Sequence, residues 1–235
     1  MSSPWEILRV GVENQLYLAR LEAEELRTLA GYRWWWRLKW ALLLNAIGGL
    51  ADRARPAIFP KRELQAADFL FGETPVLTAW QILTDLETSA FDLVVELGCG
   101  RGLVCLVASL AFGSRAVGVE IVHSRVSRLR HLIQVLGLSR VEAREADFRR
   151  EPVAEGDLYF LSPVSLEEPS WLDLQARMRA VAPGTRAVVL CEPLESAYWD
   201  TELVREYRYS WGPVLTYVQR RKALVSSSAR LASDG

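Results

Sequence analysis

The chain has 235 residues, of which 50% are hydrophobic and 24% are charged, and its formal net charge is −1. This length and apolar content allow one sizeable hydrophobic core, while a charge so near zero excludes a general electrostatic attraction to nucleic acid. Cys99, Cys105 and Cys191 are too few and wrongly spaced for a metal site or a disulfide framework, so we expect a protein of the reducing cytoplasm.

The first predicted element is a helix that begins at Pro4. Proline suits the first helical position, Glu6 places an acidic residue in the first turn, and apolar residues recur at helical spacing as far as Leu29. Gly31 is expected to end this helix.

A second segment is rich in tryptophan and in basic residues. Four tryptophans lie within residues 33–40, and residues 40–51 are twelve positions without a charge. Twelve residues are too few to span a bilayer, whose core needs about 20 apolar residues. Between residues 33 and 62 there are seven basic residues and one acidic residue. The pattern predicts an interfacial helix that contacts an anionic membrane through residues 33–51, a helical lid packed on the rest of the chain, or one segment that serves as both. We expect the whole helical extension to cover residues 1–67.

Residues 71–74 read Phe-Gly-Glu-Thr and precede a helix expected over residues 75–86. Thr74 is a good N-cap and Pro75 suits the first helical position, so this segment fits a capping arrangement.

The most informative segment is a buried strand, expected over residues 92–97, that runs into an acidic residue and three alternating glycines. The acidic residue is Glu96, and the glycines are Gly98, Gly100 and Gly102. The dinucleotide fingerprint would require a glycine in place of Leu103, and no Lys-Ser or Lys-Thr follows to form a phosphate loop. The turn therefore indicates a bulky ligand that carries a positive charge and no phosphates, bound at the start of a helix expected over residues 103–112.

The next strands end in polar residues that suit the same ligand. A strand over residues 115–120 ends at Glu120, whose carboxylate can accept hydrogen bonds from two ribose hydroxyls. A strand near residues 140–145 is followed by Asp147 and Phe148. S-adenosylmethionine is a positively charged nucleoside without phosphates, and it is the predicted cofactor.

Further strands are expected near residues 157–162 and 186–191, with helices between most of the strands. This alternation predicts an α/β fold with a doubly wound, mostly parallel sheet. Residues 204–211 and 214–220 are two strand-like runs joined by Gly212 and Pro213, too close together for a crossover helix, and they predict an antiparallel hairpin at the end of the sheet. The last residues, 224–235, are expected to be a flexible tail.

These segments resemble a known family. The E-x-G-x-G-x-G run at residues 96–102 and the V-G-V-E run at residues 117–120 are similar to motifs I and II of the class I S-adenosylmethionine-dependent methyltransferases. Residues 71–74 resemble the Y-G-E-T segment of the seven-strand lysine methyltransferases that modify a histone core lysine. The general layout is also similar to that of the ATP synthase c-subunit lysine methyltransferases. The resemblance covers residues 68–222. Where the histone enzymes have an Asn pair after strand four, this chain has Leu161, Ser162 and Pro163.

The resemblance implies a seven-stranded methyltransferase domain at residues 68–223 and a set of cofactor contacts. These contacts are Phe71, Glu73, Thr74, Glu96, Gly98, Cys99, Gly100, Gly102, Glu120, Ile121, Asp147 and Phe148. Asp147 would take the adenine amino group, although an aspartate at that place is also a common turn or cap residue. Ser162 and Pro163 would lie beside the methyl acceptor, and Ser162 also fits a plain turn before proline.

The sequence thus predicts a methyltransferase that acts on a protein lysine, with a membrane-associated substrate as the sharper hypothesis. Such an enzyme would be cytoplasmic, or peripheral at the inner face of the membrane. Methylation of a small molecule or a lipid is the alternative, expected if the amino-terminal helices close an apolar cap over the pocket. A catalytically inactive, cofactor-binding scaffold is a third interpretation, and a dehydrogenase is a remote fourth.

Overall fold

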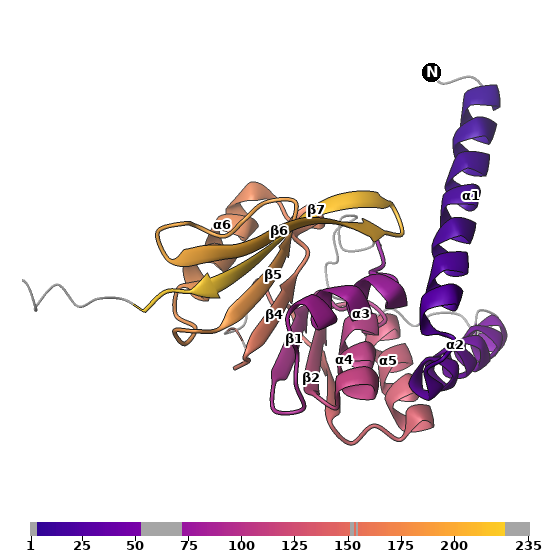
Figure 1. Cartoon of the computed structure of the whole chain (residues 1–235), viewed down its shortest axis with the longest axis horizontal. Coiled ribbons are helices and arrows are strands. Elements are labelled where there is room, and N and C mark those ends of the chain that lie inside the picture. The colour runs from indigo at the N-terminus through magenta and orange to yellow at the C-terminus, as the bar shows by residue number, and fades with distance from the viewer. Residues whose placement is uncertain (1–3, 53–71, 151–152, 154, 224–235) are drawn as a thin grey trace, which may run out of the picture.

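A computed structural model describes residues 4–52, 72–150, 153 and 155–223. These residues form a seven-stranded sheet in the order β3-β2-β1-β4-β5-β7-β6, with helices on both faces (Figure 1). The strands are β1 (Leu93–Leu97), β2 (Arg115–Glu120), β3 (Val141–Glu145), β4 (Leu158–Leu161), β5 (Arg186–Leu190), β6 (Trp199–Tyr209) and β7 (Gly212–Arg221). The first five strands pair in parallel, and β7 pairs antiparallel with both β5 and β6. The predicted α/β fold with a doubly wound, mostly parallel sheet is confirmed.

Apolar, β-branched runs such as Leu-Val-Val in β1 and Ala-Val-Val in β5 are buried on both sides because helices cover each face of the sheet. One face is covered by α3 (Val76–Asp85), α4 (Leu103–Phe112) and α5 (His123–Leu136), and the other by α6 (Glu168–Met178). Successive strand residues alternate between the two cores, as Val94 and Val95 do.

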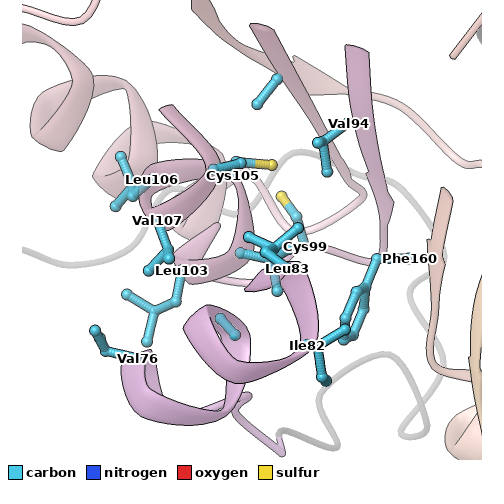
Figure 2. Close-up of a cluster of buried hydrophobic side chains, with 14 of the residues drawn as sticks. Val76, Ile82, Leu83, Val94, Cys99, Leu103, Cys105, Leu106, Val107 and Phe160 are labelled. Carbon is cyan, nitrogen blue, oxygen red and sulfur yellow. The ribbon is translucent and has the colours of Figure 1, made fainter. Parts of the chain in front are cut away.

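The larger core centres on α4, whose bounds agree with the expected helix at residues 103–112. Its first six residues are all buried, since α4 lies between the sheet and α3 (Figure 2). Leu106 and Val107 of α4 belong to the same core as Ile82 and Leu83 of α3. A rigid, fully packed α4 fixes the position of the glycine turn that precedes it.

The carboxyl-terminal hairpin is present, but its predicted turn is wrong by two residues. The turn is Ser210-Trp211, whereas Gly212 and Pro213 already belong to β7, where Pro213 pairs with Arg208. Gly212 has a φ of +133°, a conformation that glycine adopts most easily, so the glycine signal marks the start of the strand and not the middle of the turn.

The amino-terminal segment forms two helices, α1 (Pro4–Leu29) and α2 (Arg33–Asp52), which pack outside α3, α4 and α5. Glu25 joins three helices, because its buried carboxylate accepts hydrogen bonds from Trp35 Nε1 at 2.9 Å and from the Leu77 N–H at 3.4 Å, and Lys39 Nζ lies 2.9 Å away. A buried carboxylate needs such partners. Both helices are therefore docked on the sheet domain, although α1 extends well beyond it (Figure 1).

The tryptophan-rich helix α2 has two different faces. Trp35, Leu38 and Ala41 are buried against the sheet domain. The opposite face exposes Trp36, Trp40, Leu43 and Leu44. No helix among the described residues is long and apolar enough to cross a membrane. The expected boundary at residue 67, the expected tail and four of the seven basic residues (Arg53, Arg55, Lys61 and Arg62) lie outside the described residues.

Candidate functional site

A cavity of about 300 Å³ opens where the carboxyl ends of β1, β2 and β4 meet. In an open α/β sheet this is the crevice where ligands bind, at the point where the strand order reverses. Eleven predicted site residues line it: Glu73, Thr74, Glu96, Gly98, Cys99, Gly100, Glu120, Ile121, Asp147, Phe148 and Ser162. Gly102 and Pro163 are not among the lining residues, and Phe71 lies outside the described residues.

The glycine turn forms the floor of this cavity. Gly98, Gly100 and Gly102 all have positive φ, between +55° and +77°, where a side chain would be strained. A Cβ on Gly102 would lie 2.6 Å from Leu129 Cδ2, so this glycine serves the approach of α5 to the turn and does not face the cavity. The sulfur of Cys99 likewise points at Gly118, 2.7 Å from where a Cβ would stand there.

Glu120 holds the turn in place. One carboxylate oxygen, Oε2, accepts a hydrogen bond from the Gly100 N–H at 2.9 Å, and Oε1 accepts one from the Val122 N–H at 2.8 Å. Arg125 Nη1 lies 3.6 Å from Oε2. A carboxylate offers about four acceptor positions, so Glu120 retains capacity for the hydroxyl groups of a ligand.

Glu96 is a buried acid at the back of the cavity. Burial raises the pKa of Glu96 to about 8, while hydrogen bonds from Cys105 act in the opposite direction. The Cys105 thiol donates to Glu96 Oε2 at 3.4 Å. Near neutral pH the acid is therefore largely uncharged, and a positively charged ligand beside it would favour the ionised form.

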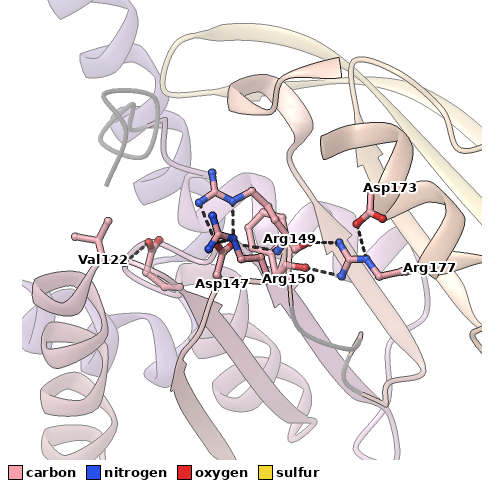
Figure 3. A network of polar contacts seen from close by, with 8 residues as sticks. Val122, Asp147, Arg149, Arg150, Asp173 and Arg177 are labelled. Atoms are coloured by element: carbon pink, nitrogen blue, oxygen red, sulfur yellow. Dashed lines mark hydrogen bonds and ion pairs between the residues drawn. The ribbon is translucent and has the colours of Figure 1, made fainter. Parts of the chain in front are cut away.

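Asp147 is held by arginines in a network that spans the loop after β3 (Figure 3). Arg149 binds both carboxylate oxygens, with Nε 2.8 Å from Oδ1 and Nη2 3.1 Å from Oδ2. Burial raises the pKa of Asp147, but the hydrogen bonds from Arg149 outweigh it and the net pKa is lowered. Arg177 of α6 donates to the carbonyl oxygens of Phe148 and Arg149 at 2.7 and 2.9 Å, which fixes the loop.

Several lining residues were missed by the sequence reasoning. They are Gly72, Leu97, Arg101, Leu103, Arg125, Arg149, Phe160, Val164, Leu166 and Trp211. Arg101 stands inside the glycine motif and forms a bidentate ion pair with Glu73. The signal available in the sequence was its place within that motif. Trp211 gave no local signal, because only the register of β6 and β7 brings it to the cavity.

The turn between β6 and β7 completes the wall on this side. Ser210 Oγ accepts a hydrogen bond from the Glu73 N–H at 2.9 Å, and the Ser210 N–H donates to the Glu73 carbonyl at 3.2 Å. The indole of Trp211 covers Gly72, where a Cβ would stand 2.4 Å from two ring carbons. Residues near the two ends of the sheet domain thus meet at one edge of the cavity.

No family model and no curated protein matches this chain. Solved structures do resemble it. An RNA methyltransferase from Salinibacter ruber in complex with S-adenosyl-L-homocysteine has 21% identity and a TM-score of 0.56, and the match covers 66% of this chain and 97% of that one. TrmN from Thermus thermophilus has 20% identity and a TM-score of 0.57, over 66% of this chain and 51% of that one. The magnesium protoporphyrin IX methyltransferase ChlM from Synechocystis PCC 6803, with bound SAM, has 12% identity and a TM-score of 0.53, over 63% and 78%.

The chain has the class I methyltransferase fold. The matches span about two thirds of the chain, and at these identities they establish the fold alone. The specific resemblance to lysine methyltransferases has no counterpart among these three structures, whose acceptors, where named, are RNA and a porphyrin.

A second cavity lies beside the first. It measures about 400 Å³ and lies between α1, α2 and the first turns of α3 and α4. Glu73, Arg101 and Leu103 line both cavities, so the Glu73–Arg101 ion pair stands between them. Within the described residues, α1 and α2 line this second cavity and not the first, so they do not form the closed cap considered from the sequence.

Proposed function

We propose that this chain is an S-adenosylmethionine-dependent methyltransferase. The observation that carries the proposal is that one cavity collects the glycine turn, Glu96, Glu120 and the Asp147–Phe148 pair from three consecutive strand ends. The chemistry of these groups suits that cofactor: a carboxylate for the ribose hydroxyls, an aromatic ring and a carboxylate for the adenine, and a buried acid for the positive charge. The backbone of Gly98, Cys99, Gly100 and Ile121 would approach the cofactor closely.

When bound, the cofactor supplies a methyl group on a sulfonium, and the protein has to hold the acceptor in line with it. The side of the cavity that remains for the acceptor is lined by Phe160, Ser162, Val164, Leu166 and Trp211. These side chains exclude water, and an apolar environment lowers the pKa of an entering amine. Ser162 is the polar group among them and is assigned a positioning role, with Pro163 shaping the loop.

A protein lysine is the acceptor that we favour. Trp211 lies at the rim of the cavity, partly exposed, where its ring can contact a lysine ammonium before the amine loses its proton. The adjoining cavity favours the second candidate, a small-molecule or lipid acceptor, because Leu18, Leu21 and Leu42 would suit an apolar tail. Cofactor binding without any methyl transfer would support the third interpretation, a catalytically inactive, cofactor-binding scaffold.

We further propose that α2 brings the enzyme to a membrane surface. Trp36, Trp40, Leu43 and Leu44 share one exposed helix face, with Trp40 61% exposed, and such side chains insert at the headgroup level. Arg33 lies beside this stripe. Lys39, by contrast, is engaged with Glu25 and Glu22, at 2.9 and 3.6 Å, so the aromatic and aliphatic side chains would dominate the contact.

Calorimetric titration tests the cofactor. S-adenosylhomocysteine is expected to bind with a dissociation constant in the micromolar range or below, and NAD is expected not to bind. Glu120→Ala removes the acceptor for two backbone N–H groups and should weaken binding at least tenfold. Glu142→Ala is the matched control, since this carboxylate is exposed on β3 and away from the cavity. Tight NAD binding would refute the cofactor.

Transfer of radiolabelled methyl groups tests the acceptor. An extract of the source cell is incubated with labelled S-adenosylmethionine and divided into soluble protein, membrane protein and organic-extractable fractions. Methyl-lysine recovered from membrane protein supports both the lysine acceptor and the membrane contact. Label confined to the organic fraction selects the small-molecule or lipid candidate.

A further inference from the structure

Toward its amino terminus α1 leaves the sheet domain. Among the contacts of the described residues, the last anchor in that direction is Tyr17, whose hydroxyl donates to the Tyr209 carbonyl at 2.9 Å, and residues 11–16 before it are all exposed. In Figure 1, α1 is the one labelled helix that projects far from the rest. Helical turns without tertiary packing are marginal in water, so this half of α1 lacks the stabilisation that a partner would supply.

An apolar stripe runs along the outer face of α1. It consists of Val12, Leu16, Ala19, Ala23 and Leu26, at alternating spacings of four and three residues. Val12, Leu16 and Leu26 are 51%, 54% and 46% exposed. This is the spacing at which one helix packs along another. The face that docks on the domain is a different one, formed by Leu21, Glu25 and Leu29.

We propose that this stripe pairs with the same stripe of a second copy of the chain, with the two α1 helices antiparallel. The twofold axis passes between residues 17 and 18. Leu16 then faces Ala19 of the second copy, and Val12 faces Ala23 of the second copy. Each of these layers joins one large and one small side chain, which fills the space between the helices evenly, while Leu26 faces Arg9 of the second copy at either end. Between residues 12 and 23 the stripe is thus complementary to itself, as a twofold interface requires.

Charges beside the stripe agree with this arrangement. Glu13 and Arg20 lie on the same flank of α1, and antiparallel pairing about this axis brings Glu13 of one copy to Arg20 of the other, twice by symmetry. Within the described residues Arg20 has no ion-pair partner, while Glu13 has a long contact of 3.8 Å with Arg9. Parallel pairing would instead place Arg9 against Arg9, and Ala19 and Ala23 against themselves, leaving like charges and a gap in successive layers.

The pairing also accounts for the length of α1. The projecting half of one α1 would lie on the docked half of the other, whose stripe faces away from its own domain. Each exposed amino-terminal half thereby gains a folded surface to pack on. The two catalytic domains are expected at opposite ends of the helix pair, with neither active-site cavity covered.

Sedimentation and light scattering of the full-length protein test the proposal. We expect a dimer at micromolar concentration, and Leu16→Glu should make it a monomer. Asn14→Glu is the matched control, because it adds the same charge at the same level of α1 on the other side of the helix, and it should remain a dimer. A wild-type protein that stays monomeric up to ~100 µM overturns the proposal.

Charge exchange tests the orientation. Glu13→Arg and Arg20→Glu should each raise the dimer dissociation constant about tenfold, and the double variant should restore it, because the two positions exchange signs. Failure of the double variant to recover affinity would contradict the antiparallel pairing. The helical content of all three variants, measured by circular dichroism, separates loss of pairing from loss of folding.

Engineered cysteines give a second, independent readout. In a Cys191→Ser background, which removes the exposed native thiol, the double variant Val12→Cys, Ala23→Cys should form a disulfide between copies on mild oxidation. Each single variant should not, since equivalent residues lie far apart in an antiparallel pair. Crosslinking of the single variants would show a parallel pair and refute the proposal. Engineered cysteines that are protected from oxidation only when lipid vesicles are present would also refute it.

Discussion

The protonation of Glu96 makes the stability of the folded protein depend on pH. Its pKa is raised to about 8 from an ordinary 4.5, chiefly because the carboxyl is buried. Between these two values the folded protein holds a proton that the unfolded chain has lost. The stability contributed by the neutral acid is therefore complete at low pH, and it declines as pH rises through this window.

A single amide replacement should remove this dependence. In Glu96→Gln the side chain stays neutral at every pH, so we expect its free energy of unfolding to vary less between about pH 5.5 and pH 7.5 than that of the wild type. The difference in slope should approach ~1.4 kcal/mol per pH unit. Urea denaturation at several pH values measures it, with exposed Glu142→Gln as the control. Parallel curves for wild type and Glu96→Gln would show that Glu96 is ionised in the folded protein.

Glycine is required at position 72 because Trp211 lies against it, and not because of the backbone conformation there. A Cβ there would stand 2.4 Å from two ring carbons of Trp211, and its φ is not positive. Gly72→Ala should therefore displace the Trp211 indole and lower kcat/KM for methyl transfer about tenfold, with little effect on S-adenosylhomocysteine affinity.

The double variant Gly72→Ala, Trp211→Ala distinguishes this clash from a backbone effect. Once the indole is gone, the added methyl group has space, so the glycine substitution should cost nothing further. Additive losses in the two single variants and the double variant would mean that Gly72 acts by another route.

Local sequence was sufficient for elements whose signals lie within a few residues. The glycine turn, the acid that ends β2 and the bounds of α4 all follow from a buried strand, a sharp turn and an apolar helix in immediate succession. Trp211 reaches the same cavity from a place that only tertiary structure determines. The hairpin turn was misplaced because Gly212 and Pro213 are common turn residues, whereas here they begin a strand.

The docking of α2 rests on a few buried side chains. Leu38 is fully buried in the core shared with α4 and α5. Leu38→Ala should lower the free energy of unfolding by about 2–5 kcal/mol, the usual cost of such a cavity. Leu43→Ala, on the exposed face of the same helix, should change it by less than about 0.5 kcal/mol. Equal effects in chemical denaturation would indicate that α2 is not docked as described.

At the scale of the whole molecule, the sequence left open whether the tryptophan-rich helix is a lid or a membrane contact. Its periodicity contains both an inward and an outward apolar face, so no single interpretation could be selected from composition. In the structure Trp35 is buried in the core and donates a hydrogen bond to Glu25, whereas Trp36 and Trp40 are exposed. The orientation of α1 and α2 on the sheet domain depends on contacts between segments more than forty residues apart, such as that of Glu25 with Leu77. Such contacts cannot be read from a local pattern.

Lipid binding should follow the outward face alone. We expect the protein to co-sediment with vesicles that contain anionic lipid, and the double variant Trp36→Ser, Trp40→Ser to lose most of this binding because both exposed indoles are removed. Vesicles of neutral lipid should bind less, since Arg33 contributes attraction to anionic headgroups. Val135→Ser and Val204→Ser, two exposed apolar positions elsewhere, serve as the control. Unchanged binding in the tryptophan variant would exclude this face as the lipid contact.

The contact between the Ser210-Trp211 turn and residues 72–73 has a consequence for biosynthesis. A chain emerging from the ribosome exposes β1, its glycine turn and Glu120 long before β6 and β7 have been made. Until Trp211 leaves the exit tunnel, one wall of the cavity is missing and Glu73 has no Ser210 to fix its backbone. A ligand that needs the complete cavity can therefore protect against proteolysis only those chains from which Trp211 has already emerged, and abundance of that ligand would influence the yield of folded protein without affecting early folding.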